Sequence, residues 1–369
     1  MTEPFEPPVY PYERLAGAKE KADAHPGGVV DLSIGTPCDP PPAFVVEALA
    51  TSNAERGYPA SVGTPALRDA AAAWMARRLG VDVAPSAIAA CVGTKEFVGT
   101  LPQWLKLRRP DRDTVLYPAV SYPTYEMGAT LAGCRAVAVA VDEHFRLDLR
   151  SIAVEDAERA LVLWVNSPGN PAGQLDDLGA VAAWGRDHGV PVASDECYVE
   201  FTWDTEPQSI LQHGGDGVLA VHSLSKRSNL AGARVGFYAG DADLVHYLSE
   251  VRKHVGLMVP GPIQAAAVAA LGDQVHVDAQ RGRYRERLER MRQILGALGI
   301  DAPMPDGGFY LWARVPDGDA WGFTDQLAAD GGALVSPGDL YGEAGTGYIR
   351  VALVQPLERI ELVAQRLGL

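Results

Sequence analysis

Cysteine is scarce in this sequence. The 369 residues contain four cysteines, at positions 38, 91, 134 and 197. No two of them have the spacing of a metal-binding pair, and four scattered thiols do not form a disulfide framework. We therefore expect buried free thiols of a protein in the reducing cytoplasm, and no metal site.

Basic residues and long apolar runs are also lacking. The chain has 32 lysines and arginines against 47 aspartates and glutamates, a formal net charge of −15. Such a charge repels phosphate polymers, so we expect neither nucleic acid nor an anionic membrane as a partner. No run approaches the ~20 apolar residues of a membrane span, and residues 1–14 lack the apolar segment of a signal peptide. These absences predict a cytoplasmic protein without a membrane anchor.

What the chain does contain is a regular alternation of short apolar runs and helical stretches. This alternation predicts an α/β fold in which a mostly parallel, seven-stranded sheet lies between helices. We expect residues 44–258 to form this large domain. Residues 1–43, an arm with a helix at 13–24, should join residues 259–369 in a smaller α/β domain. Strands are predicted at 88–92, 114–117, 136–141, 160–165, 190–194, 218–222 and 235–239 in the large domain, and at 308–314, 332–335 and 347–353 in the small one, which ends in a helix at 357–367.

Lys226 is a candidate for covalent chemistry. It follows Ser223 and Ser225 in a run of small and apolar residues, and Arg234 comes eight positions later. A lysine amine becomes a nucleophile when burial or nearby cations lower its pKa. Such an amine is what a Schiff base with pyridoxal phosphate (PLP) requires, and the hydroxyls and the guanidinium suit the phosphate of PLP. The alternative is a lysine on a solvated loop.

Polar residues follow several of the predicted strands, where ligands bind in parallel sheets. Asp195 ends one strand and could keep the pyridine nitrogen of PLP protonated. A helix N-cap is the alternative for this residue. Gly93, Thr94 and Lys95 follow another strand and open a helix, whose N–H groups favour an anion. Asn166 follows a third strand, so we expect these strand ends to meet in one crevice.

Three further side chains could complete a PLP site. Tyr198 and Asn170 could both donate to the phenolate oxygen of the cofactor, although residues 166–173 also have the prolines and glycines of a plain turn. Tyr122 could stack on the pyridine ring, with Tyr125 as a rival and core packing as the alternative for either.

Arg350 stands in an apolar strand of the predicted smaller domain. A buried arginine must be paired, and its guanidinium fits the α-carboxylate of an amino acid. A structural ion pair is the alternative.

Taken together, these runs resemble the fold-type I PLP enzymes, and specifically the class I/II aminotransferases. The resemblance covers essentially the whole chain and depends on residues 58–63, 166–173, 195–198, 223–226 with 232–236, and 349–352. It implies a PLP-dependent aminotransferase that acts on small amino acids and keto acids. One departure is Ala172, where many relatives carry threonine.

The resemblance also implies roles for individual residues. Lys226 would be the Schiff-base lysine and the proton shuttle, with Asp195 on the pyridine nitrogen. The active site would be shared in a homodimer, because the tyrosine of the matching segment reaches the phosphate of the neighbouring subunit. The implied phosphate site consists of Gly93, Thr94, the backbone of Lys95, Ser223, Ser225, Arg234 and Tyr58; Asn170 and Tyr198 hold the phenolate oxygen; and Arg350, with Gly35 and Asn170, binds the substrate.

Within the family, residues 11–22, 32–37 and 122–128 resemble actinobacterial N-succinyldiaminopimelate aminotransferases of lysine biosynthesis. This resemblance implies glutamate as donor and the conversion of N-succinyl-2-amino-6-oxopimelate to N-succinyl-LL-2,6-diaminopimelate. An aspartate or aromatic aminotransferase, or a PLP-dependent C–S β-lyase on the same fold, remains an alternative. A PLP-binding regulator would need a basic DNA-binding domain, and a nucleotide-binding protein would need a Gly-x-Gly-x-x-Gly run after its first strand; the sequence has neither.

Overall fold

The computed structural model describes residues 5–369, and its main element is a seven-stranded sheet. The strand order is β2-β8-β7-β6-β5-β3-β4, and only β8 runs antiparallel to its neighbours. The predicted mostly parallel sheet is therefore confirmed. The strands are β2 (Ile88–Cys91), β3 (Thr114–Pro118), β4 (Arg135–Val139), β5 (Ala160–Asn166), β6 (Val192–Asp195), β7 (Val218–Ser223) and β8 (Gly236–Gly240).

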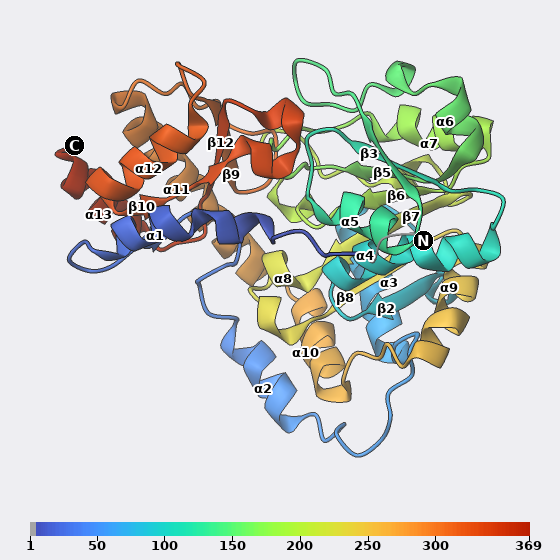
Figure 1. Ribbon diagram of the computed structural model, residues 1–369. Coiled ribbons are helices and arrows are strands. Elements are labelled where there is room, and N and C mark those ends of the chain that lie inside the picture. Colours follow the sequence, from blue (N-terminus) through green and yellow to red (C-terminus); the bar gives the residue numbers. More distant parts are fainter. Residues whose placement is uncertain (1–4) are drawn as a thin grey trace.

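Helices cover both faces of this sheet (Figure 1). In β5, Leu163 and Val165 pack into the core beneath one helical layer, while Val162 and Trp164 pack into the core beneath the other. A strand buried on both sides reads as a continuous apolar run, which is why β5 was visible in the sequence. One layer contains α3 (Pro65–Leu79), α7 (Leu178–His188) and α10 (Gly261–Gly272), and the other contains α4 (Thr94–Arg108), α5 (Thr124–Leu131) and α9 (Ala242–Val255).

A second, smaller sheet has the antiparallel order β11-β12-β9. The single strand predicted at 332–335 is wrong, because the chain changes pairing partner at Val335. Before it, β10 (Ala333–Leu334) pairs with β1 (Val30–Asp31); after it, β11 pairs with β12. The other elements of this part are β9 (Tyr310–Arg314), β11 (Ser336–Pro337), β12 (Tyr348–Ala352), α11 (Val275–Ala297), α12 (Ala320–Gly331) and α13 (Leu357–Leu367).

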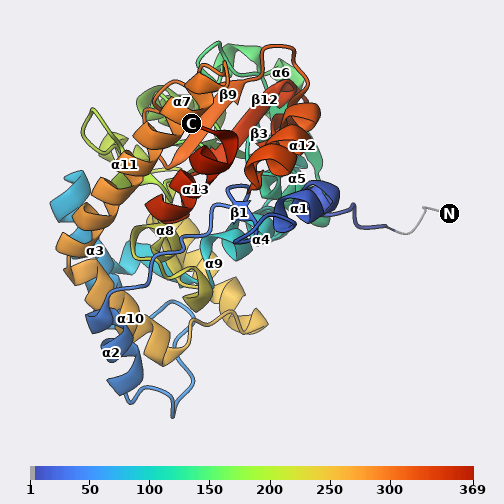
Figure 2. The same ribbon diagram turned by 90° about the vertical axis from the view of Figure 1, so that its left-hand side faces the viewer.

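The beginning of the chain packs against this later part. The helix α1 (Ala16–Asp23) lies beside α12 in both views (Figures 1 and 2). Its buried Ala18 and Ala22 share a core with Ala328 and Leu334. Tyr10 and Tyr12, which precede α1, line a pocket together with residues of both sheets. The 3-10 helices and short helices are η1 (Pro11–Leu15), η2 (Pro85–Ala87), η3 (Leu149–Ser151), α6 (Val154–Arg159), η4 (Val199–Phe201), η5 (Ile210–His213), α8 (Leu224–Arg227), η6 (Ala231–Ala233), η7 (Gly338–Tyr341) and η8 (Glu343–Gly345).

The helix α2 (Ala43–Thr51) packs on α10 at the lower edge of Figure 1. All four cysteines are free, but only Cys91 is buried, and Cys38 is exposed. The expectation of buried thiols was therefore too general, because a small residue in a surface loop needs no burial. No helix within residues 5–369 has the length and apolar character needed to cross a membrane.

Candidate active site

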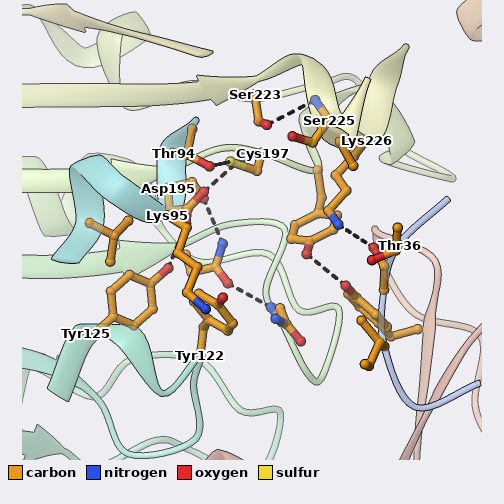
Figure 3. A pocket seen from close by; sticks show the side chains of 18 of the residues that line it. Thr36, Thr94, Lys95, Tyr122, Tyr125, Asp195, Cys197, Ser223, Ser225 and Lys226 are labelled. Carbon is orange, nitrogen blue, oxygen red and sulfur yellow. Dashed lines mark hydrogen bonds between the residues drawn. The ribbon is translucent and has the colours of Figure 1, made fainter. Parts of the chain in front are cut away.

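The carboxyl ends of β5, β6 and β7 face a pocket of about 560 Å³ (Figure 3). Asn166, Asp195 and Ser223 are the last residues of these three strands, and all of them line the pocket. Tyr310 of β9 and Arg350 of β12 line it from the smaller sheet. The pocket therefore lies between the two sheets, as parallel strand ends predict.

Asp195 is a buried carboxylate at the end of β6. Its Oδ2 accepts a hydrogen bond from the Tyr125 hydroxyl at 2.9 Å, and its Oδ1 accepts one from the Cys197 backbone at 3.2 Å. Burial raises the pKa of Asp195, although both of these donors oppose the rise. The Cys197 bond belongs to a turn and is not the helix N-cap considered above, because the next helix, η4, has Tyr198 as its N-cap residue. The Asp195 carboxylate lines the pocket.

Tyr125 is fully buried, with its hydroxyl on Asp195 and its ring centroid 5.1 Å from that of Trp164. It lines the pocket, but its hydroxyl is already bound to Asp195 and its ring packs beside Trp164. Tyr122 is only half-buried and lines the pocket. Of the two rivals, the geometry therefore favours Tyr122 for stacking on a planar ring in the pocket (Figure 3).

Lys226 projects into the pocket from the short helix α8, and its Nζ donates a hydrogen bond to the Gly35 carbonyl. Burial lowers the pKa of Lys226 to about 8, and the cations of Arg350 and Arg234 contribute to the decrease. A Cβ at position 35 would clash with the Tyr310 hydroxyl oxygen, so a larger residue there requires the Tyr310 side chain to move. The solvated-loop alternative for Lys226 is excluded by this position.

Hydroxyls and a guanidinium gather at the α4 end of the pocket. Thr94 begins α4 and accepts a hydrogen bond from the Cys197 thiol, while Ser223 accepts one from the Ser225 backbone. The Arg234 guanidinium lies over Gly93. A Cβ added to Gly93 would come within 2.6 Å of the Arg234 Cζ. Gly93 does not line the pocket but makes room for this arginine at a φ of 75°. This cradle suits a phosphate at a helix N-terminus.

Arg350 is 1% exposed and faces the opposite end of the pocket. It donates to Asn170 Oδ1 at 2.8 Å and to the Ser33 carbonyl, and its Nε has no partner within residues 5–369. Its guanidinium lies 4.4 Å from the Tyr310 ring centroid and 4.6 Å from that of Tyr341. Arg350 therefore does not form the structural ion pair considered as an alternative.

Asn166 connects Asp195 and Asn170 through hydrogen bonds. Its Nδ2 donates to the Asp195 carbonyl at 2.8 Å, and its Oδ1 accepts from the Asn170 backbone at 2.8 Å. Asn170 in turn accepts from Arg350, so hydrogen bonds connect Arg350 to the strand that carries Asp195. The sequence placed Asn166 at a strand end but assigned it no role.

The structure brings all but two of the predicted site residues to the pocket wall. Gly93 lies behind Arg234, and Tyr58 is 98% exposed on the segment that follows α2. The assignment of Tyr58 to a neighbouring subunit stays a prediction. The predicted residues that line the pocket are Gly35, Thr94, Lys95, Tyr122, Asn170, Asp195, Tyr198, Ser223, Ser225, Lys226, Arg234 and Arg350.

Sequence reasoning missed the tyrosines around Arg350. Tyr310 forms a hydrogen bond of 2.8 Å with the Tyr198 hydroxyl, and Tyr12 forms one of 3.1 Å with Tyr341. Strand alternation is the signal that could have identified Tyr310. Trp312 pairs with Arg350 across the two strands, and Tyr310, two residues before Trp312, lies on the same face of the sheet. No comparable signal marks Tyr12, whose position depends on how α1 packs.

The donor set fits PLP. Lys226 supplies an amine of lowered pKa, and Asp195 is a buried carboxylate without an ion-pair partner among residues 5–369. Thr94 and Arg234 lie in the cradle for an anion, and Tyr198 lines the same pocket. These are the groups that the aldehyde, the ring nitrogen, the phosphate and the phenolate of PLP require.

Comparison with known proteins agrees with this geometry. Residues 27–367 match the family model described as aminotransferase class I and II. The chain is 45% identical to the 4-dedimethylamino-4-oxo-anhydrotetracycline transaminase OxyQ of Streptomyces rimosus, over 98% of this chain and 99% of that protein. It is 35% identical to an LL-diaminopimelate aminotransferase of Aquifex aeolicus, over 98% and 96%.

A solved structure from Thermus thermophilus, described as a probable N-succinyldiaminopimelate aminotransferase, superimposes with a TM-score of 0.86. That protein is 31% identical, and the match covers 96% of this chain and 98% of the other. The chain thus has the fold-type I architecture and belongs to the class I and II aminotransferases, which are PLP-dependent enzymes.

Proposed function

We propose that this aminotransferase transfers the amino group of glutamate to N-succinyl-2-amino-6-oxopimelate, forming N-succinyl-LL-2,6-diaminopimelate. The observation that carries the α-amino acid part is Arg350, a buried guanidinium at the pocket that no carboxylate within residues 5–369 neutralises. The α-carboxylate of an amino acid or keto acid supplies the missing charge. The diaminopimelate part is supported by the Aquifex aeolicus relative and the Thermus thermophilus structure.

PLP, when bound, withdraws electrons from the α-carbon of the substrate. Asp195 keeps the ring nitrogen of the cofactor protonated, and the Tyr125 and Cys197 hydrogen bonds orient its carboxylate for this contact. Asn170 and Tyr198 donate to the phenolate oxygen. Tyr122 packs against the face of the ring.

Lys226 moves the proton. With PLP and substrate bound, the Nζ of Lys226 would accept the proton from the substrate Cα and serve as the proton shuttle of the reaction. A pKa near 8 suits this task, because the amine is then partly neutral at physiological pH. Arg350 holds the α-carboxylate through the transfer, so the Cα proton remains within reach of Lys226.

The active site is also proposed to need two chains. Tyr58 is almost fully exposed on the segment 52–63, which projects beyond α2 and α10 (Figure 1). A tyrosine in that position cannot serve the pocket of its own chain and is free to reach another. The assembly is therefore proposed to be a homodimer in which Tyr58 contacts the phosphate in the neighbouring subunit.

The direct test is a panel of amino donors and keto acids with the purified holoenzyme. We expect glutamate to convert the enzyme to its pyridoxamine form, and N-succinyl-2-amino-6-oxopimelate to convert it back. Lys226→Ala should lose nearly all turnover, since general base catalysis contributes about 10²–10⁴-fold and the covalent attachment is lost as well. Turnover of a sulfur-containing amino acid without any keto acid would identify a C–S β-lyase instead.

A second acceptor class has a specific observation in its favour. The relative OxyQ, at 45% identity, is described as acting on a 4-oxo-anhydrotetracycline, and the pocket of this chain is bordered by the rings of Tyr10, Tyr12 and Tyr122. These rings could pack against a flat polycyclic ketone. A 4-oxo-anhydrotetracycline should be included in the acceptor panel. If the enzyme prefers it over every keto acid, the diaminopimelate assignment is wrong.

A further inference from the structure

Two charged residues beside the start of α4 form a largely buried ion pair that the proposed function does not use. The Arg252 side chain, in the last turn of α9, is 1% exposed, and Glu96 lies in the first turn of α4. The guanidinium donates from Nη1 to Glu96 Oε1 and from Nη2 to Glu96 Oε2, each at 2.7 Å. Neither residue lines the pocket. A two-pronged pair of this kind fixes the position of the carboxylate as well as neutralising its charge.

Glu96 is also hydrogen-bonded to the turn between β2 and α4. Its Oε2 accepts a hydrogen bond from the Val92 backbone at 3.2 Å, and its Oε1 accepts one from the Thr100 hydroxyl at 3.0 Å. Val92 lies between the end of β2 and Gly93, the N-cap residue of α4. The carboxylate thereby holds the turn against the first turn of the helix, much as the glutamate of a capping box does. Contacts thus run from Arg252 through Glu96 to Val92.

This turn leads directly into the helix end that is assigned to the phosphate of PLP. Thr94 and Lys95 follow the turn, begin α4 and line the pocket (Figure 3). The free backbone N–H groups of a helix N-terminus bind an anion when the preceding turn points them at it. A displacement of the turn would therefore alter the phosphate cradle and leave the positions of Lys226 and Asp195 unchanged.

Glu96 also brings a negative charge to the end of the helix where an anion binds. A carboxylate in the first turn interacts favourably with the positive end of the helix dipole, so it competes with a phosphate for that end. Arg252 compensates this charge, and no other cation within residues 5–369 forms an ion pair with Glu96. Burial acts to lower the pKa of Arg252, but Glu96 outweighs it, and the pKa lies above its ordinary value. The neutral pair leaves the positive end of the α4 dipole to a ligand.

We propose that Arg252 is a positioning residue for the cofactor, because through Glu96 it holds the turn between β2 and α4 in the form that binds the phosphate. The inference rests on the assignment of the cradle at the start of α4 to the phosphate of PLP. It explains why the carboxylate that Arg252 binds is also the one that is hydrogen-bonded to the turn.

The test compares PLP with pyridoxal, which has the same aldehyde and ring but no phosphate. Absorbance titration of the apoenzyme measures the affinity for each. We expect Arg252→Met to raise the dissociation constant of PLP about 10–30-fold and that of pyridoxal less than about twofold. A general loss of structure would weaken the binding of both ligands alike.

Two further variants show whether the effect belongs to this pair. Arg252→Met combined with Glu96→Gln removes both charges and keeps an oxygen for the Val92 N–H group, so it should recover most of the PLP affinity. Arg287→Met is the matched control. Arg287 forms the same two-pronged pair with Asp39, with both bonds at 2.7 Å, and neither of these residues lines the pocket. This control should leave the ratio of the two dissociation constants unchanged.

Equal losses for PLP and pyridoxal in Arg252→Met would overturn the proposal. A double variant that binds PLP as weakly as Arg252→Met alone would also overturn it, since Arg252 would then not act through Glu96. If wild-type apoenzyme binds pyridoxal as tightly as PLP, the assignment of the cradle fails, and the inference fails with it. If wild type prefers PLP and Arg252→Met keeps the full preference, only this inference fails.

Discussion

At the scale of single residues, the hydrogen bond between Tyr125 and Asp195 decides how the cofactor ring is held. Within residues 5–369, the Asp195 carboxylate accepts hydrogen bonds from two donors, the Tyr125 hydroxyl and the Cys197 backbone. A buried carboxylate that loses one of two donors loses orientation as well as stabilisation of its charge. Tyr125 is therefore a positioning residue that acts through Asp195.

Tyr125→Phe should raise the dissociation constant of PLP about tenfold, because a hydrogen bond to a charged group is worth about 1.5–3 kcal/mol. Absorbance titration of the apoenzyme with PLP measures this. Tyr247→Phe, which loses a hydrogen bond to the Trp104 carbonyl away from the pocket, is the control and should leave PLP affinity unchanged. An unchanged affinity in Tyr125→Phe would show that the Cys197 bond alone orients Asp195.

The lowered pKa of Lys226 predicts how fast the apoenzyme takes up its cofactor at different pH values. The folded pKa is about 8 instead of 10.5, so the neutral amine becomes abundant as the pH rises through 8. The rate at which PLP attaches should rise with pH and level off above that point. Stopped-flow absorbance checks this, with Lys253→Ala as a control that keeps the profile. A rate that still rises steeply near pH 10 would contradict the lowered pKa.

The residue scale also shows where sequence reasoning stops. Lys226, Asp195 and Arg350 could be found because each is a charged residue in an apolar run, which is costly unless it has a function. The position of the Lys95 side chain could not be predicted, because a lysine at the start of a helix is common on protein surfaces. Its hydrogen bond to Tyr10 depends on how the N-terminal arm packs. Tyr125 could be identified as a candidate, but its contact with Asp195 depends on the tertiary packing of α5 against α4, β3 and β4.

At the scale of elements, Glu196, which follows β6, lies beside His222 of β7 behind the pocket, and no hydrogen bond within residues 5–369 connects the two side chains. Glu196 Oε2 lies 3.4 Å from His222 Nε2, while its Oε1 accepts from Ser194 at 2.9 Å and from the Ile210 backbone at 2.8 Å. Burial raises the pKa of Glu196 to about 7 and lowers that of His222 to about 3. Burial thus favours the neutral form of both side chains. The folded protein loses stability when high pH ionises Glu196 or when low pH protonates His222.

Glu196→Gln should therefore stabilise the protein at neutral and alkaline pH. The folded pKa of Glu196 is raised from 4.5 to about 7, so its contribution is fully present below pH 4.5 and is lost as the pH rises through 7. Relative to wild type, the variant should gain about 1–3 kcal/mol in free energy of unfolding between pH 5 and pH 8. Urea unfolding at both pH values measures the difference. Glu250→Gln, an exposed site, should show no such pH-dependent gain.

The elements themselves were predictable to different degrees. The helix predicted at 357–367 has these bounds in α13, because one apolar face, with Ile360, Val363 and Ala364, repeats at helical spacing. Of the strand predicted at 332–335, only Ala333 and Leu334 pair, in β10, and the chain joins the second sheet from Ser336 onward, in β11. Its residues are all buried, so the apolar pattern gives no sign of the point where the pairing partner changes.

At the scale of the whole molecule, the proposed homodimer makes each pocket depend on two chains. Lys226 comes from one subunit, and Tyr58 is proposed to come from the other. If so, two defective chains can form one intact site when their defects lie on opposite sides of the interface. The prediction needs no structure of the dimer, only the assignment of the two residues to different subunits.

Co-expression of Lys226→Ala with Tyr58→Ala should yield more activity than the sum of the two separate variants. In the mixed dimer, one site combines intact Lys226 with intact Tyr58, and the other has lost both. Purification through two different affinity tags isolates this dimer for assay. A mixed dimer no more active than Tyr58→Ala alone would show that Tyr58 does not act across subunits, and light scattering would show whether the dimer exists.

The joining of the two chain ends has a consequence for biosynthesis. Lys226 and Asp195 leave the ribosome midway, whereas Arg350 lies close to the carboxyl terminus, and β10 must emerge before β1 finds its partner. A nascent chain can therefore possess its cofactor lysine long before it possesses its carboxylate receptor. The order of residues therefore separates the synthesis of the cofactor lysine in α8 from that of the carboxylate receptor in β12.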